Sequence, residues 1–102
     1  MIADISKHRE ELQELCRRFH VRRLDLFGSA ASDDFDWARS DLAFLVEFQL
    51  LPSGAYADAF FGLKESLEQL FGRRADLVAD AAIRNPYFRA TVDRTRALLY
   101  AV

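Results

Sequence analysis

The chain has 102 residues, 51% of them hydrophobic, and this length allows one compact domain, which we expect to span residues 1–102. Sixteen acidic and fourteen basic residues give a net charge of -2, so no overall positive field favours direct binding to nucleic acid or to an anionic membrane. No stretch reaches the roughly 18 apolar residues that a membrane-spanning helix needs. The single cysteine, Cys16, cannot form an internal disulfide. These features predict a reduced, cytoplasmic protein.

The hydrophobic pattern predicts an α/β (α+β) domain, with a small mixed sheet of about three strands and about four flanking helices. Apolar residues at three- and four-residue spacing indicate a first amphipathic helix over residues 4–19. Alternation then indicates a strand from Val21 that ends at Gly28, where the chain turns. A short helix is expected within residues 29–36.

The second half of the chain continues this alternation of strands and helices. A second strand is indicated by Leu42, Phe44, Val46 and Phe48, which share one apolar face. After a loop at 49–56, apolar spacing predicts a helix over 60–71 that ends at Gly72, then a third strand over 75–79. The Asn-Pro pair at 85–86 precedes a final helix that we expect to extend to Leu99.

The other face of the second strand carries the candidate chemistry. Positions 41 and 43 point the same way, about 6 to 7 Å apart, and carboxylates there could share magnesium ions beside a Gly-Ser turn that takes phosphate oxygens. Asp41 is present, but the second position is Ala43. Asp76 lies on the third predicted strand and comes close to Asp41 if the two strands are neighbours. One or two carboxylates plus substrate phosphates are enough to hold magnesium.

No other acidic residue is expected to replace the carboxylate that is absent at Ala43. Glu47 shares the face of Asp41 but lies about 20 Å further along the strand. The acidic residues at 33, 34 and 36 are typical of a solvated loop.

Five segments together resemble the minimal nucleotidyltransferase domains of the DNA polymerase β superfamily. The family signature is a Gly-Ser turn, a spacer and an Asp-x-Asp strand. The family's segments match Leu26-Phe27-Gly28-Ser29, residues 39–48 apart from position 43, Phe61-Gly62-Leu63-Lys64-Glu65, Asp76-Leu77-Val78 and Asn85-Pro86-Tyr87-Phe88. The resemblance covers almost the whole chain and implies the nucleotidyltransferase fold, which binds ATP with Mg2+. It also implies an antitoxin that is paired with a HEPN-type toxin and transfers AMP to a toxin tyrosine.

The resemblance assigns roles to individual residues. Gly28 and Ser29 would hold nucleotide phosphates, and Asp41 and Asp76 would be the catalytic carboxylates that ligate magnesium. Lys64 would approach a phosphate, although its spacing equally suits a lysine that faces solvent.

Two departures from the family pattern point to weakened catalysis. Ala43 replaces the second Asp, which would bridge both metal ions, and Ser32-Asp33 replaces the Arg-Gly that commonly follows the turn. One hypothesis is therefore an adenylyltransferase antitoxin of low activity. The alternative is a non-catalytic binding module that neutralises a HEPN-type toxin by occlusion. Transfer to a small molecule such as an aminoglycoside lacks support, because the chain has no second domain to form a substrate cleft.

The chain also carries more aromatic residues than a core of this size needs. We expect some of them to form an interface with a partner protein or with a second copy of the chain in a homo-oligomer. The candidates are Phe60, Phe61, Tyr87, Phe88 and Tyr100.

Overall fold

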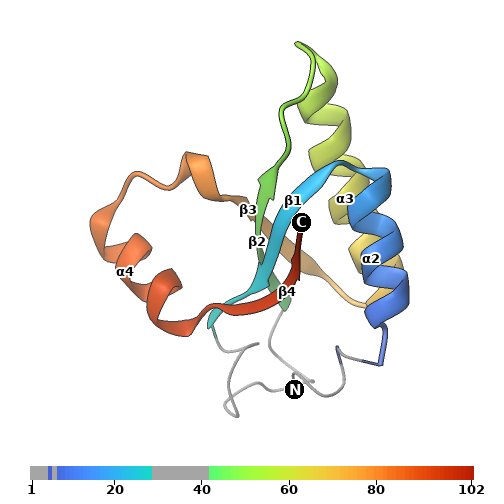
Figure 1. Cartoon of the computed structure of the whole chain (residues 1–102). Coiled ribbons are helices and arrows are strands. Elements are labelled where there is room, and N and C mark those ends of the chain that lie inside the picture. The colour runs from blue at the N-terminus through green and yellow to red at the C-terminus, as the bar shows by residue number, and fades with distance from the viewer. Residues whose placement is uncertain (1–4, 6, 29–41) are drawn as a thin grey trace.

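The computed structural model of the chain describes residues 5, 7–28 and 42–102 and shows a four-stranded sheet between two layers of helices (Figure 1). The strand order is β3-β2-β1-β4, in which β2 pairs with β1 antiparallel and with β3 parallel, and β4 pairs with β1 antiparallel. The predicted fold class is confirmed. The strands are β1 (Val21–Leu26), β2 (Leu42–Phe48), β3 (Ala75–Ala79) and β4 (Ala97–Ala101).

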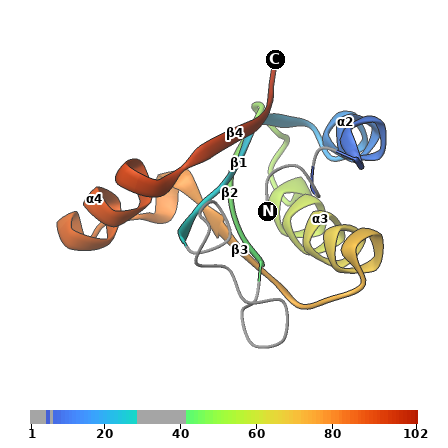
Figure 2. The same ribbon diagram turned by 90° about the horizontal axis from the view of Figure 1, so that it is seen from below.

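Helices α2 (Arg9–Arg18) and α3 (Ala55–Phe71) cover one face of the sheet, and Figure 2 shows both on the same side of it. Their buried residues pack against the apolar face of β2 that the alternation predicts, in one core that includes Leu12, Leu42, Phe44, Leu63 and Leu67. Helix α3 ends as predicted at Gly72. This residue has a positive φ, and its N–H donates to the carbonyl oxygen of Glu68 in the last turn of the helix.

Helix α4 (Pro86–Thr95) covers the opposite face of the sheet (Figure 2). The side chain of Asn85 caps its start by accepting hydrogen bonds from the N–H groups of Tyr87, at 2.8 Å, and of Phe88, at 3.2 Å. Val92 of this helix is completely buried and forms a second apolar cluster with Leu45 of β2 and with Phe27, the residue that follows β1. Among the residues that the structure describes, this face is therefore covered by α4, which is preceded by the short 3-10 helix η2 (Asp80–Ala82).

The end of the chain differs from the sequence prediction. The spacing predicts a final helix that reaches Leu99, but α4 ends at Thr95, because Arg96 takes an extended backbone conformation. Residues 97–101 then pair with β1 as an edge strand that the sequence pattern did not indicate. Positions 88, 92, 95 and 99 fit helical spacing, and only the distant partner strand selects the extended form.

Two further elements can be compared with the prediction. Of the helix predicted over 4–19, the structure describes α2 from Arg9 to Arg18 and a helical Ile5, while residues 4 and 6 lie outside the described residues. Strand β1 ends at Leu26, two residues before the glycine turn. The short helix expected within residues 29–36 lies outside the described residues. None of the helices that can be described is long and apolar enough to cross a membrane.

Candidate functional site

Phe27, which follows β1, Ala43 of β2 and Asp76 of β3 form a row across one end of the sheet. The N–H of Phe27 donates to the carbonyl oxygen of Ala43 at 3.0 Å, and Ala43 is the register partner of Asp76. Neighbouring strands lie about 4.8 Å apart, so Ala43 stands midway between the residue before the glycine turn and the carboxylate on β3. The structure confirms that the strands of Ala43 and Asp76 are neighbours, as the sequence analysis required.

Asp76 presents an exposed carboxylate on the α4 side of the sheet. Its neighbours Ala75 and Leu77 are buried on the opposite face, and side chains alternate along a strand. Within the described part of the chain, the Asp76 carboxylate has no hydrogen bond or ion pair. A free carboxylate oxygen is a ligand that magnesium accepts.

The described residues do not form a metal site by themselves. In residues 5, 7–28 and 42–102, no three His, Cys, Asp or Glu side chains come together in a way that could hold a metal ion. Asp76 therefore fits magnesium as one ligand, of the kind that needs further oxygen atoms from substrate phosphates or from another carboxylate. Two of the predicted site residues, Ser29 and Asp41, lie outside the described residues.

Gly28 forms the turn that follows β1. Its φ of +69° lies in the left-handed region, where a side chain is strained, and a Cβ built there meets no atom within 4 Å. As far as the described residues show, a glycine is therefore required here for the backbone conformation of the turn and not for a close approach by another group. The N–H of Gly28 donates to the hydroxyl oxygen of Thr95 at 2.9 Å, so this N–H is already engaged within the protein.

Ala43 makes the centre of the row apolar. It is half-buried and packs against the cluster of Phe27, Leu45 and Val92. Glu47 lies four residues further along β2 and pairs with Arg22 at 3.7 Å, in agreement with its exclusion as a substitute. The row thus combines the residue before the glycine turn, the methyl group of Ala43 and the carboxylate of Asp76.

The structure does not bring Lys64 to the face that carries Asp76. Lys64 lies on α3, which covers the opposite face, and its Nζ is 3.4 Å from a carboxylate oxygen of Glu68. The Glu68 carboxylate also accepts a hydrogen bond from the N–H of Ala75 at 3.0 Å. That bond, with the charge of Lys64, lowers the pKa of Glu68. The contact of Lys64 with phosphate therefore stays a prediction, made from sequence resemblance alone.

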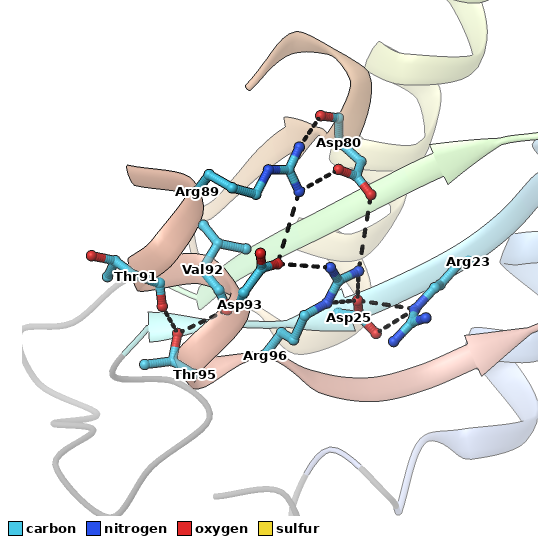
Figure 3. A network of polar contacts seen from close by, with 9 residues as sticks. All are labelled: Arg23, Asp25, Asp80, Arg89, Thr91, Val92, Asp93, Thr95 and Arg96. Atoms are coloured by element: carbon cyan, nitrogen blue, oxygen red, sulfur yellow. Dashed lines mark hydrogen bonds and ion pairs between the residues drawn. The ribbon is translucent and has the colours of Figure 1, made fainter. Parts of the chain in front are cut away.

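An ion-pair network around a buried aspartate, which the sequence did not predict, lies beside the row, between the sheet and α4 (Figure 3). Asp25 of β1 is completely buried and accepts a hydrogen bond from the Nε of Arg96 at 2.7 Å. The Nε of Arg23 lies 3.2 Å from both carboxylate oxygens of Asp25. In the sequence, the signal for this network was Asp25 itself, an acidic residue directly before the Leu-Phe-Gly segment. Its partner Arg96 could not be identified, because it lies 71 residues away.

Two further acidic residues extend this network to the middle of α4. Arg89 contacts Asp80 through an ion pair of 2.6 Å, and Arg96 contacts Asp93 at 3.2 Å. Burial alone would lower the pKa of Arg96, but the hydrogen bond and the negative charge of Asp25 outweigh burial and raise it. Arg96 therefore stays charged at any physiological pH.

A comparison with protein families identifies the family to which this fold belongs. The family described as nucleotidyltransferase domain matches residues 5–98. This chain belongs to the nucleotidyltransferase domain family. The resemblance expected from the sequence is confirmed.

Individual relatives agree with the family assignment. The protein adenylyltransferase MntA of Thermococcus cleftensis is 36% identical over 85 residues, which cover 79% of this chain and 75% of the relative. The solved structure of a protein described as a minimal nucleotidyltransferase superposes on this chain with a TM-score of 0.74 at 32% sequence identity. The match covers 93% of this chain and 92% of that one.

A third comparison shows the shared fold at lower sequence identity. It is a complex of a tri-AMPylated HEPN toxin with an MNT antitoxin from Shewanella oneidensis, with a TM-score of 0.64 at 16% identity. The match covers 95% of this chain and 72% of that one. The nucleotidyltransferase fold of the present chain is thus found in a toxin–antitoxin assembly.

Proposed function

We propose that this nucleotidyltransferase domain binds ATP with magnesium at the row formed by Phe27, Ala43 and Asp76, and that it acts as the antitoxin of a HEPN-type toxin. The row carries the proposal, because it places the residue before the glycine turn and the exposed carboxylate of Asp76 on one face of the sheet. The similarity to a protein adenylyltransferase named MntA supports AMP as the transferred group. We place the domain in the cytoplasm.

Each residue of the proposed site has a distinct task. Gly28 fixes the shape of the turn, and Ser29 would contact nucleotide phosphates. Asp76, together with Asp41, offers the carboxylate oxygens for magnesium, and the exposure of Asp76 leaves it open to a ligand. When bound, magnesium neutralises phosphate charge and steadies the leaving pyrophosphate.

Ala43 reduces the chemistry that this site supports. It stands opposite Asp76 in the register, at the place where a second carboxylate would share a metal ion with both neighbours. Its methyl group has no oxygen to ligate a metal or to accept a proton from an attacking hydroxyl. We therefore propose that nucleotide binding is retained and that AMP transfer is slow.

A second candidate function, neutralisation of a toxin by occlusion, is favoured by an apolar surface at the edge of the sheet. A cavity of about 430 Å³ lies between α3 and β3, and none of its lining residues is charged. Two aromatic residues at this cavity are exposed, Tyr56 to 47% and Phe61 to 64%. Exposed apolar surface of this kind commonly marks a protein interface, and it does not depend on catalysis.

Labelled ATP and a HEPN-type toxin distinguish the two functions. The toxin is incubated with magnesium, labelled ATP and either the native chain, the Ala43→Asp variant or the Ala43→Asn variant, in which the new side chain has a similar size and no charge. The proposal predicts weak labelling of the toxin by the native chain and by Ala43→Asn, and stronger labelling by Ala43→Asp.

The same experiment contains outcomes that would contradict the proposal. Strong labelling by the native chain would show that Ala43 does not limit catalysis. No labelling by any variant, together with toxin inhibition by all of them, would support occlusion. Combining Asp76→Asn with Ala43→Asp should abolish labelling if Asp76 holds the metal, and unchanged labelling would remove Asp76 from the site.

A further inference from the structure

A single hydrogen bond links the glycine turn to the last residue of α4. The N–H of Gly28 donates to the Oγ1 of Thr95, at 2.9 Å and across 67 residues of sequence. Gly28 is the residue with positive φ that gives the turn its shape. The conformation of the turn is therefore held from the helix that covers this face of the sheet.

The hydroxyl of Thr95 is fixed in direction by its own helix. It donates to the carbonyl oxygen of Thr91 at 2.9 Å, a bond visible in Figure 3, which leaves its oxygen lone pairs for the N–H of Gly28. Thr91 provides a natural comparison one turn earlier, because its hydroxyl donates to the carbonyl of Tyr87 at 3.1 Å and it is exposed. The two threonines differ in that only Thr95 reaches the glycine turn.

The residue after Thr95 fixes the end of α4 to the same strand. Arg96 binds the buried carboxylate of Asp25, which precedes Gly28 by three residues. The last residue of α4 and the residue after it therefore hold two nearby points, Gly28 of the turn by a hydrogen bond and Asp25 of β1 by an ion pair. Arg89 and Asp80 add a second attachment of α4 next to β3 (Figure 3).

We propose that Thr95, supported by the Arg96–Asp25 ion pair, is a positioning residue that holds the Gly28 turn in the conformation that receives nucleotide phosphates. This inference rests on the proposed function. A neutral hydrogen bond contributes modestly to a conformational equilibrium, so removal of the hydroxyl should weaken the affinity for nucleotide about three- to tenfold. The effect is expected to act through the turn, since the contact of Thr95 with the site is its hydrogen bond from the Gly28 N–H.

The test replaces Thr95 by Val, which removes the hydroxyl, and by Ser, which keeps it. Thr91→Val is the matched control, because it removes a hydroxyl from the same helix without touching Gly28. Exchange of the Gly28 amide hydrogen is measured by NMR, and the dissociation constant of MgATP is measured by calorimetry. Thermal unfolding of all variants reports any general loss of stability, and Thr95→Ala provides a second variant if the Val side chain prevents folding.

The proposal expects Thr95→Val to expose the Gly28 amide to exchange and to weaken MgATP binding, while Thr95→Ser and Thr91→Val behave like the native chain. A protected Gly28 amide in Thr95→Val, or unchanged affinity despite its exposure, would overturn the positioning role. If the native chain itself does not bind MgATP, the proposed function fails and the nucleotide role of Thr95 fails with it. The exchange of Gly28 would still decide separately whether Thr95 holds the turn.

Discussion

The carboxylate of Asp25, completely buried in a central strand of the sheet, is bound by the guanidinium of Arg96 at the end of α4, with 2.7 Å between Nε and Oδ2. A buried charge is stable only when it is paired, and removal of one partner leaves the other uncompensated. The pair thus joins the sheet to the helix that covers the candidate site.

We predict that Arg96→Met destabilises the protein by about 3 kcal/mol, because it leaves the buried charge of Asp25 without its main ion-pair partner. The loss should lie at the low end of the usual range, since Arg23 still contacts Asp25 and the Arg96 side chain is 20% exposed. Urea unfolding gives the free energy of each variant.

Two controls make this prediction specific. Arg94→Met removes an exposed arginine from the same helix and should change the free energy of unfolding by less than about 0.5 kcal/mol. The double variant Asp25→Leu with Arg96→Met replaces both charges with apolar side chains and should be more stable than Arg96→Met alone. A double variant as unstable as the single one would show that the helix needs the ion pair itself.

A second prediction concerns the close approach of Gly62 in α3 to Phe19 at the end of α2. A Cβ at position 62 would come within 2.5 Å of a ring atom of Phe19, so the ring must move in Gly62→Ala. Overpacking should exceed the gain of about 1 kcal/mol in helix propensity and give a net loss of about 1 kcal/mol. Chemical unfolding should show this loss, and its reversal when Phe19→Leu is added would identify the ring as the cause.

A third prediction concerns the reactivity of the single cysteine. Cys16 is buried in the core, as its place on the apolar stripe of the first helix predicted, and burial raises the pKa of its thiol to about 12. The thiol is therefore neutral at pH 8, and it should react with a thiol reagent only as fast as the protein unfolds. Cys16→Ala combined with Ser53→Cys, at an exposed loop position, should react at once. Rapid labelling of native Cys16 would contradict its burial.

The strands around the candidate site were predictable from local patterns. Strands β2 and β3 begin and end where the apolar alternation indicates, at 42–48 and 75–79. A helix separates them, and a strand, a helix and a following strand usually form one parallel unit. That arrangement is what places Asp76 beside Ala43.

The contacts on the other side of the site were not predictable, because they join distant parts of the chain. Edge strand β4 has apolar spacing that also fits a helix, and its pairing with β1 decides its conformation. The partners of Asp25 and Gly28 are Arg96 and Thr95, which are 71 and 67 residues away. No periodic pattern indicates a single long-range ion pair or hydrogen bond.

A fourth prediction concerns the stability of the protein in acid. Glu68 has a lowered pKa in the folded state, chiefly because the N–H of Ala75 donates to its carboxylate. The unfolded chain therefore takes up this proton at higher pH than the folded chain, so the stabilisation is present above the unfolded pKa and is lost as pH falls through the folded pKa. In Glu68→Gln, the melting temperature should decrease less than in the native chain as the pH falls below about 4.3. Glu65→Gln, on an exposed part of the same helix, should show the same decrease as the native chain. A profile of Glu68→Gln identical to that of the native chain would contradict the role of this bond.

A fifth prediction tests the geometry of the row without any enzymatic reaction. In Ala43→Asp, the new carboxylate stands opposite Asp76 on the adjacent strand, about 5 Å away by the spacing of strands. Two negative charges at this distance repel by about 1 kcal/mol when they are well solvated and more when they are partly buried. The variant should therefore melt at a lower temperature than Ala43→Asn when a chelator removes divalent cations.

Magnesium should reverse this difference, because an ion bound by both carboxylates stabilises the folded state according to its concentration and affinity. The melting temperature of Ala43→Asp should rise with millimolar magnesium, while that of Ala43→Asn should hardly change. Addition of Asp76→Asn should remove both the repulsion and the response to magnesium. An equal response of the Ala43→Asp and Ala43→Asn variants would mean that magnesium acts elsewhere on the protein, and that the row is not where carboxylates share a metal.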